Sequence, residues 1–194
     1  MPQLDLMPAA TTVGFLVQQV PDGRLGDPTP CPDYTVGDLV EHIGGLALAF
    51  TAAAHKATGP LTSSAPSPDA SRLPTDWRSR IPADLVALAA AWRDPAGWTG
   101  MTQAGGVHLP GEVGGLVALD EIVLHGWDLA VATGQPFDVD PDLLTAVHGF
   151  VASFDPDPNA EGRLFGPVVE VPADAPLLDR VLGLAGRDPA WSRP

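Results

Sequence analysis

A carboxylate and an imidazole lie four residues apart inside an apolar stretch of the chain. The segment LDEIVLHGWDLAVATGQ, residues 119–135, carries Glu121 and His125 among leucine, isoleucine, valine and alanine. Residues four apart share one face of an α-helix, so the two side chains can reach a common point. Burying either group is costly unless it finds a partner. The pair therefore indicates one shared ligand, and a metal ion would offset the burial of both.

Two further residues can complete such a site. Asp128 lies three residues beyond His125 on the same side of the helix, where it can orient a ligand or accept a proton at the edge of the site. His42, in VGDLVEHIGGLALAF, flanks Leu39 and Ile43 on the apolar stripe of another predicted helix. If the two helices pack face to face, the His42 imidazole joins Glu121 and His125.

Two imidazoles and one carboxylate are a familiar ligand set of catalytic metal sites. They fill three positions of a zinc ion and leave the fourth for water or substrate. Nickel and iron accept the same donors, so the donor set does not choose the ion by itself. We predict His42, Glu121 and His125 as metal ligands. Asp128 then either supports a ligand or, in a structural site, fills the fourth position.

The remaining candidates are weaker. Cys31 is the only cysteine, which excludes an intrachain disulfide and cysteine-rich zinc modules. Its thiol could act as a nucleophile, but a single cysteine is more often a small buried apolar residue. We interpret His55, His108 and His148 as structural or solvent-facing. The acidic run DPDPNAEG lacks the spacing of a calcium loop and predicts a solvated turn. No serine-centred elbow, phosphate-binding loop or dinucleotide fingerprint occurs.

Apolar periodicity and chain breaks predict four main helices. We place them at about residues 3–20, 35–57, 76–92 and 112–133. Thr35 and Asp38 have the spacing of a capping box at the start of the second helix, and Gly134 is a suitable end for the fourth. Pro82 lies inside the third, where it either kinks the helix or begins it.

The connections complete the expected architecture. TGPLTSSAPSPDASRLP predicts a loop, and MTQAGGVHLPG a loop or short hairpin. Beyond the fourth helix, DPDLLTAVHGFVASF predicts a helix, GPVVEVPA a short strand and APLLDRVLGLAG a final helix. Four helices with long connections favour an antiparallel bundle. We expect one mainly α domain over residues 1–194, with the bundle at about 3–134 and a short α/β appendage at about 135–194.

Composition narrows the classes of partner and location. Ten basic against 24 acidic residues give a net charge of −14, which would repel nucleic acid and anionic membranes. The longest apolar stretches fall short of the roughly 20 residues that span a bilayer, and the N-terminus lacks the basic start of a signal peptide. A cytoplasmic protein is therefore expected. One lysine, one asparagine and one tyrosine suggest a GC-rich, actinobacterial genome.

Four motifs, in order along the chain, resemble a known family. They are PCPDYTVGDLVEHIGG, LDEIVLHGWDLAVATGQ, FGPVVEVPADAP and LAGRDPAW. They resemble the actinobacterial metal-binding proteins related to mycothiol-dependent maleylpyruvate isomerase, within the DinB/YfiT-like superfamily. The resemblance runs from about residue 28 to the end of the chain, and HGWDLAVATGQ and GRDPAW are its more specific parts.

The resemblance implies a DinB-like four-helix bundle that holds a divalent metal, commonly zinc, through His42, Glu121 and His125. It also implies a low-molecular-weight thiol such as mycothiol or bacillithiol as cosubstrate, and it favours a homodimer. The isomerase has a sizeable second domain, whereas this chain has only some 50 residues after the fourth helix. Its maleylpyruvate substrate is therefore not carried over.

Three hypotheses follow from these observations. In the first, the metal activates the thiol, which attacks a small electrophile, as in a transferase or isomerase. In the second, the metal activates water and the protein is a hydrolase. In the third, the metal is structural, its fourth position is closed, and the protein is a binding module without catalytic activity.

Overall fold

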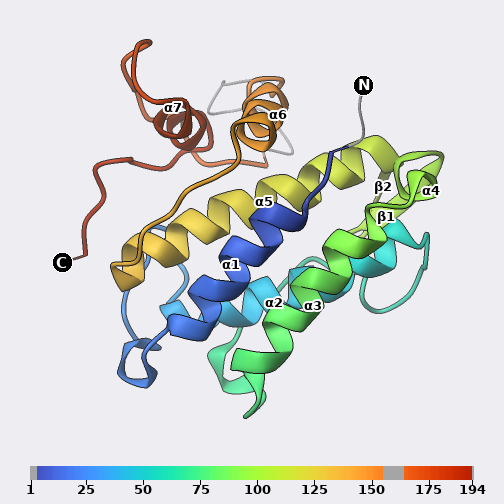
Figure 1. Cartoon of the computed structure of the whole chain (residues 1–194), viewed down its shortest axis with the longest axis horizontal. Coiled ribbons are helices and arrows are strands. Elements are labelled where there is room, and N and C mark those ends of the chain that lie inside the picture. Colours follow the sequence, from blue (N-terminus) through green and yellow to red (C-terminus); the bar gives the residue numbers. More distant parts are fainter. Residues whose placement is uncertain (1–3, 155–163, 194) are drawn as a thin grey trace.

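Four helices form the main body of the protein (Figure 1). The structure is a computed structural model that describes residues 4–154 and 164–193. The four helices are α1 (Met7–Gln19), α2 (Val36–Ala54), α3 (Trp77–Ala91) and α5 (Gly111–Thr133). Helices α1 and α2 each pack against both α3 and α5. The predicted mainly α four-helix bundle is confirmed, and each helix lies within about four residues of its predicted limits.

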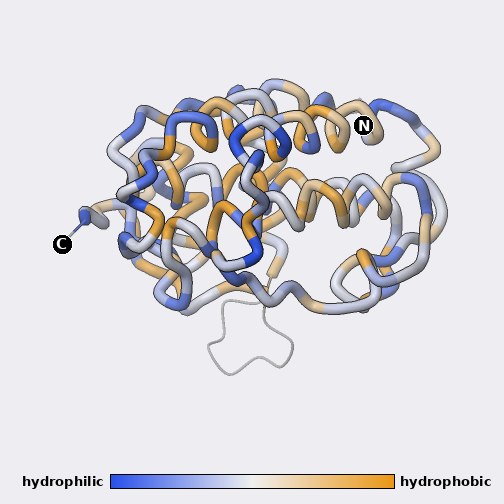
Figure 2. Tube along the Cα trace, turned by 90° about the horizontal axis from the view of Figure 1, so that it is seen from below, coloured by the Kyte–Doolittle hydropathy of each residue, from blue (hydrophilic) through white to orange (hydrophobic). Residues whose placement is uncertain are grey.

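The apolar faces that predicted the helices meet in the interior of the bundle. Each of the four contributes fully buried side chains, among them Val17 of α1, Leu39 of α2, Leu85 of α3 and Leu119 of α5. In Figure 2 the hydrophobic residues recur along the helices at successive turns. Burial of one such leucine contributes about 1.5–3 kcal/mol relative to its exposure. This packing holds α2 against α5, together with the polar residues that the two helices carry.

Local hydrogen bonds fix the start of α2 and the segment before it. The Thr35 hydroxyl accepts from the Asp38 N–H (3.2 Å), and the Asp38 carboxylate accepts from the Thr35 N–H (3.0 Å), which confirms the capping box. Upstream, the Thr29 hydroxyl lies 2.9 Å and 2.8 Å from the carbonyl oxygens of Cys31 and Tyr34. Cys31 and Tyr34 are thereby held next to the first turn of α2.

The ends of α3 and α5 settle two points that the sequence raised. α3 begins at Trp77, so Pro82 lies within the helix and does not start it. α5 ends at Gly134, whose left-handed backbone (φ 74°) confirms the predicted C-terminal glycine.

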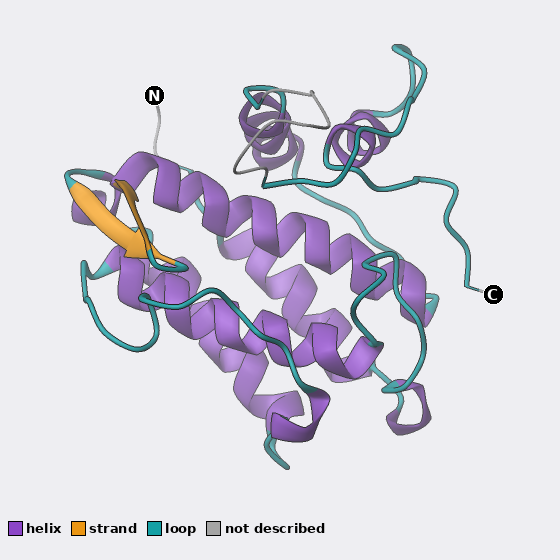
Figure 3. Cartoon of the chain, turned by 180° about the vertical axis from the view of Figure 1, so that it is seen from behind, coloured by secondary structure: helices purple, strands orange, loops and turns teal. Residues whose placement is uncertain are grey.

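A small hairpin closes one end of the bundle (Figure 3). Strands β1 (Met101–Ala104) and β2 (Val107–Pro110) pair antiparallel, which confirms the hairpin alternative for this segment. A one-turn helix that the sequence did not indicate, α4 (Pro95–Trp98), precedes it. The Thr102 hydroxyl donates to the Ala53 carbonyl (2.6 Å), which ties β1 to the C-terminal end of α2.

The C-terminal residues add two helices beside α5. α6 (Pro141–Val151) packs on α5, and α7 (Leu177–Leu184) packs on α6. The strand predicted in GPVVEVPA is wrong: residues 166–173 have no partner strand in the described part of the chain, and the Val169 N–H instead donates to the Gly183 carbonyl of α7 (2.9 Å). The acidic run DPDPNAEG, residues 155–162, lies outside the described residues.

One helix has the length and composition of a membrane span. α2 has 19 residues and a mean hydropathy of 1.2, more than its separate apolar runs suggested. However, 56% of this stretch is buried inside the bundle, and it includes Asp38, Glu41 and His42. The core helix of a soluble protein has the same features, so α2 is weak evidence for a membrane.

Candidate metal centre

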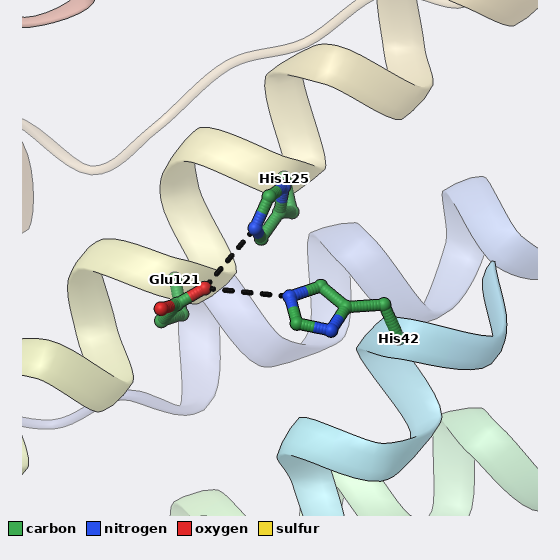
Figure 4. A group of neighbouring side chains, drawn as sticks. All are labelled: His42, Glu121 and His125. Carbon is green, nitrogen blue, oxygen red and sulfur yellow. Dashed lines mark ion pairs between the residues drawn. The ribbon is translucent and has the colours of Figure 1, made fainter. Parts of the chain in front are cut away.

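The packing of α2 against α5 brings three polar side chains to one point (Figure 4). His42 comes from α2, and Glu121 and His125 come from successive turns of α5. Their potential ligand atoms all lie within 4.8 Å of one another. The Glu121 Oε2 atom lies 3.1 Å from Nε2 of His125 and 3.7 Å from Nε2 of His42. The three residues selected by spacing in the sequence therefore converge in the fold.

The geometry of this cluster suits a divalent cation. Ligand atoms bonded at about 2.0–2.2 Å in a tetrahedral zinc site stand about 3.3–3.6 Å apart, close to the two distances found here. Figure 4 shows both imidazole rings pointing with one nitrogen toward the carboxylate. The side chains of His42 and His125 are 4% and 9% exposed, whereas that of Glu121 is 27% exposed. Access to the cluster is therefore past Glu121.

The charges of the cluster are strongly coupled. Burial opposes the charged form of Glu121, but hydrogen bonds with His125 and His42 outweigh it and hold the carboxyl pKa well below its usual range. Burial likewise opposes the charged form of His125, but its contacts with Asp128 and Glu121 raise the imidazole pKa to about 9. The carboxylates of Glu121 and Asp128 thus stabilise the positive charge of the His125 imidazolium between them. A divalent cation there would take the place of the imidazole proton.

Asp128 orients His125 from behind. Its carboxylate lies 3.0 Å from Nδ1 of His125, so this nitrogen carries a proton, and Nε2 is the nitrogen that would offer its lone pair to a bound cation. The same carboxylate accepts two hydrogen bonds from Arg187, at 3.0 Å from Nε and 2.9 Å from the terminal nitrogen. Asp128 is fully buried and both its oxygens have partners. This favours a supporting role over the fourth metal position.

Arg187 and Asp120 are part of this environment and were missed in the sequence. Arg187 follows α7 and reaches Asp128 across 59 residues of chain, so no helical spacing could indicate the pair. Arg187 lies in the motif GRDPAW, which indicated the family resemblance but gave no reason to place this arginine at the metal site. Asp120, beside Glu121, is 2% exposed, and its Oδ1 has no hydrogen-bond partner among the described residues. Burial raises the Asp120 pKa well above its usual value.

Tyr34 and Cys31 lie beside the same cluster. The Tyr34 ring lies 5.4 Å from the His42 ring and 6.4 Å from the His125 ring, between centroids. Burial, with the negative charge of Asp128, raises the pKa of the Cys31 thiol to about 11. A thiol that stays protonated at neutral pH is a poor nucleophile, which argues against that alternative for Cys31.

The other histidines lie elsewhere, as the sequence indicated. His55 is exposed at the end of α2, and His108 is exposed on β2. His148 is half-buried on α6, where its Nε2 lies 3.1 Å from a terminal nitrogen of Arg180. None of the three belongs to the cluster of His42, Glu121 and His125.

Fold and cluster together define a class: helical bundles in which a histidine of one helix meets an E-x-x-x-H pair of another. Residues 6–130 match the family model described as the mycothiol maleylpyruvate isomerase N-terminal domain. The match covers more than half of the chain, and the chain belongs to this family. The family resemblance seen in the motifs is thereby confirmed.

Two curated relatives extend the likeness beyond the bundle. They are the uncharacterized proteins MT0763 and Rv0738 of two Mycobacterium tuberculosis strains, CDC 1551 and H37Rv. Each is 28% identical over 179 residues, which cover 89% of this chain and 90% of the relative. Because the alignment covers 89% of this chain, it includes residues beyond the bundle. The mycobacterial source of both relatives agrees with the actinobacterial origin that the composition suggested.

Solved structures show the same fold at lower identity. The crystal structure of the mycothiol-dependent maleylpyruvate isomerase superposes with a TM-score of 0.58 at 17% identity, and that of a variant of this enzyme with 0.57 at 18%. In both cases the likeness covers 75% of this chain but only 66% of the other. The bundle is therefore shared, while about a third of the isomerase has no counterpart here.

Proposed function

We propose that the protein is a metal-dependent thiol transferase or isomerase that uses mycothiol. The observation that carries the proposal is the convergence of His42, Glu121 and His125 in a chain of this family. These three side chains would hold a divalent metal, for which zinc suits the donor set best and nickel or iron would also fit. Three protein ligands leave one position for an outside molecule.

The chemistry of the open position favours a thiol. A divalent metal lowers the pKa of a thiol that binds it, so that the nucleophilic thiolate forms at neutral pH. The protein's own acids then have supporting roles. Glu121 would be a ligand and not a general base, because its hydrogen bonds with both imidazoles lower its pKa and make it a weak proton acceptor. Asp128 keeps the His125 lone pair directed at the centre, and Arg187 keeps Asp128 charged.

The electrophile is proposed only by class. Access past the partly exposed Glu121 suits a small electrophile with a reactive double bond or leaving group. The isomerase's own substrate is not transferred, because the chain lacks a counterpart to about a third of that enzyme. A cytoplasmic location and a homodimer stay predictions.

Thiol consumption tests the proposal directly. Zinc-loaded protein is incubated with mycothiol and a panel of small electrophiles, and free thiol is followed with time. We expect at least one electrophile to consume thiol well above the uncatalysed rate. His125→Ala should abolish this rate, whereas His55→Ala, at an exposed histidine outside the cluster, should retain it.

The same experiment separates the other two hypotheses. Turnover of an ester or amide without any thiol, lost in His125→Ala, would indicate the hydrolase. A metal that resists exchange and gives no rate with any electrophile would indicate a structural site. The position of Asp128 disfavours that last case, because its two oxygens already bind His125 and Arg187 and do not close the fourth position.

A further inference from the structure

A second cleft lies between the C-terminal helices, away from the metal cluster. It has a volume of about 600 Å³, within the range of about 300–1,000 Å³ typical of small-molecule sites. Residues 168–173 form one side, and His148 of α6 with Arg180 and Leu184 of α7 form the other. No residue of the metal cluster lines it.

Two glycines, Gly183 in α7 and Gly186 just after it, let the segment that carries the valines of this cleft pack closely on the helix. A Cβ atom at Gly183 would lie 2.5 Å from a methyl group of Val171 and 2.6 Å from the Val169 carbonyl oxygen. A Cβ atom at Gly186 would lie 2.7 Å from the backbone of Gly166. This segment can therefore cross α7 only where side chains are missing. Its valines are fixed against the helix while Arg180 stays on the cleft side.

Arg180 stands out among the arginines of this acidic protein. Eight arginines occur in residues 4–154 and 164–193, and seven of them pair with a carboxylate. Within these described residues, Arg180 instead donates only to Nε2 of His148 (3.1 Å). A guanidinium can only donate, so His148 accepts through Nε2 and is neutral in this contact. The positive charge of Arg180 thus lacks a counter-ion of the protein in the described structure.

We propose that this cleft binds a small organic monoanion, such as a carboxylate with an apolar body. The carboxylate would pair with Arg180, since guanidinium and carboxylate match in charge and geometry. The apolar body would lie against Val168, Val169, Val171 and Leu184. Glu170, exposed on the rim, adds a negative charge that disfavours dianions. This site is independent of the function proposed for the metal centre.

Two fluorescent probes of the same shape test the proposal on the full zinc-loaded chain. 8-Anilinonaphthalene-1-sulfonate carries an apolar body and one negative charge, and N-phenyl-1-naphthylamine is its neutral counterpart. We expect Arg180→Gln to raise the Kd of the anionic probe about tenfold and to leave that of the neutral probe unchanged. Glu170→Gln should lower the Kd of the anionic probe two- to threefold.

Three controls keep the test decisive. Arg93→Gln removes an exposed arginine that follows α3 and does not line the cleft, so it should change neither Kd. Ala173→Trp places a bulky side chain at the exposed wall of the cleft and should weaken the binding of both probes. His125→Ala should weaken the binding of neither probe. The proposal is overturned if Arg180→Gln changes the Kd values no more than Arg93→Gln does, or if it weakens the binding of both probes equally. It is also overturned if Ala173→Trp leaves both Kd values unchanged or if His125→Ala abolishes probe binding.

Discussion

Asp128 is the residue on which the proposed centre depends most without belonging to its ligands. It is fully buried, and its hydrogen bond with His125 Nδ1 and the neighbouring Arg187 lower the pKa of its carboxyl group. Groups that orient a metal-bound histidine typically contribute 10- to 100-fold to metal affinity, about 1.4–2.7 kcal/mol. The direction of the His125 ring is thus set by residues from two distant parts of the sequence.

Asp128→Asn should therefore weaken zinc binding about 10- to 100-fold while the three ligands remain. The amide keeps the shape of the side chain but loses the charge that stabilises the Nδ1 proton. Competition against a chromophoric chelator measures the affinity. Asp174→Asn, at an exposed position, serves as the matched control. Equal zinc affinity in Asp128→Asn and the control would contradict the role given to Asp128.

Two arginine–aspartate pairs of similar geometry allow a comparison of burial. Arg187 with Asp128 is 14% and 0% exposed, whereas Arg93 with Asp5 is 54% and 51% exposed. We expect Arg187→Ala to lower the free energy of unfolding by about 3–5 kcal/mol, because it leaves the buried Asp128 carboxylate without its arginine partner. Arg93→Ala should cost at most about 1 kcal/mol. Urea unfolding of the metal-free variants measures both, and similar losses would count against the argument.

The residues differ in how well the sequence could reveal them. Glu121 and His125 were found because four-residue spacing on a helix is a local rule, and His42 because it interrupts an apolar stripe. Arg187 and Asp120 could not be found in this way. The role of Arg187 depends on how the residues after α7 lie against α5 in the fold. Asp120, one position from Glu121, would ordinarily be assigned to the solvent-exposed face of the helix.

At the scale of the element, the start of α2 gives a prediction about pH. The Thr35 side chain and the backbone N–H groups of Thr35 and Ala70 bond the Asp38 carboxylate and lower its pKa. A carboxyl group with a lowered folded-state pKa stabilises the protein above its unfolded-state value of about 3.9. That contribution disappears as the pH falls through the lower, folded-state pKa.

Asp38→Asn should accordingly be less stable than the unmodified protein by about 0.5–2 kcal/mol at pH 7. The difference should begin to narrow below about pH 4, where Asp38 becomes protonated in the unfolded state, and should be lost below the folded-state pKa, where it is protonated in both states. Unfolding curves of the two proteins between about pH 2.5 and about pH 7 measure the difference. A gap that stays constant down to the lowest pH would show that the charge of Asp38 has no part in the cap.

The crossing of residues 166–171 over α7 gives a second prediction at this scale. Gly183→Ala should destabilise the protein by about 1–3 kcal/mol, because its methyl group would overlap Val171 and the Val169 carbonyl. Gly149→Ala is the matched control, since Gly149 lies in α6 with nothing within 4 Å of its would-be Cβ. A helix-interior glycine there should gain about 0.5–1 kcal/mol on replacement by alanine. Thermal unfolding compares them, and a Gly183→Ala protein as stable as Gly149→Ala would contradict the close approach.

The strand predicted in the same segment was wrong for a physical reason. Alternating and β-branched residues in VVEV are typical of a strand. A ladder, however, needs a partner strand, and here the neighbour is α7. The four long helices were predicted well because their apolar periodicity and their caps are properties of each segment alone. The strand depended on what lay next to it.

At the scale of the whole molecule, the bundle and the C-terminal helices are joined by the buried pair of Asp128 and Arg187. The chain thus places a family-specific motif, GRDPAW, directly behind a candidate metal ligand. The family model matches the bundle, residues 6–130, whereas α6, α7 and their cleft lie outside that match. Sequence analysis predicted the bundle, but the position of the C-terminal helices came only from the fold.

Anomalous X-ray scattering from zinc-loaded crystals, with data on both sides of the zinc edge, tests the central claim most directly. We expect one anomalous peak per chain within bonding distance, about 2.0–2.2 Å, of Nε2 of His42, Nε2 of His125 and the Glu121 carboxylate, with no fourth protein ligand. A peak at another place, no peak at all, or a fourth ligand from the protein would contradict it.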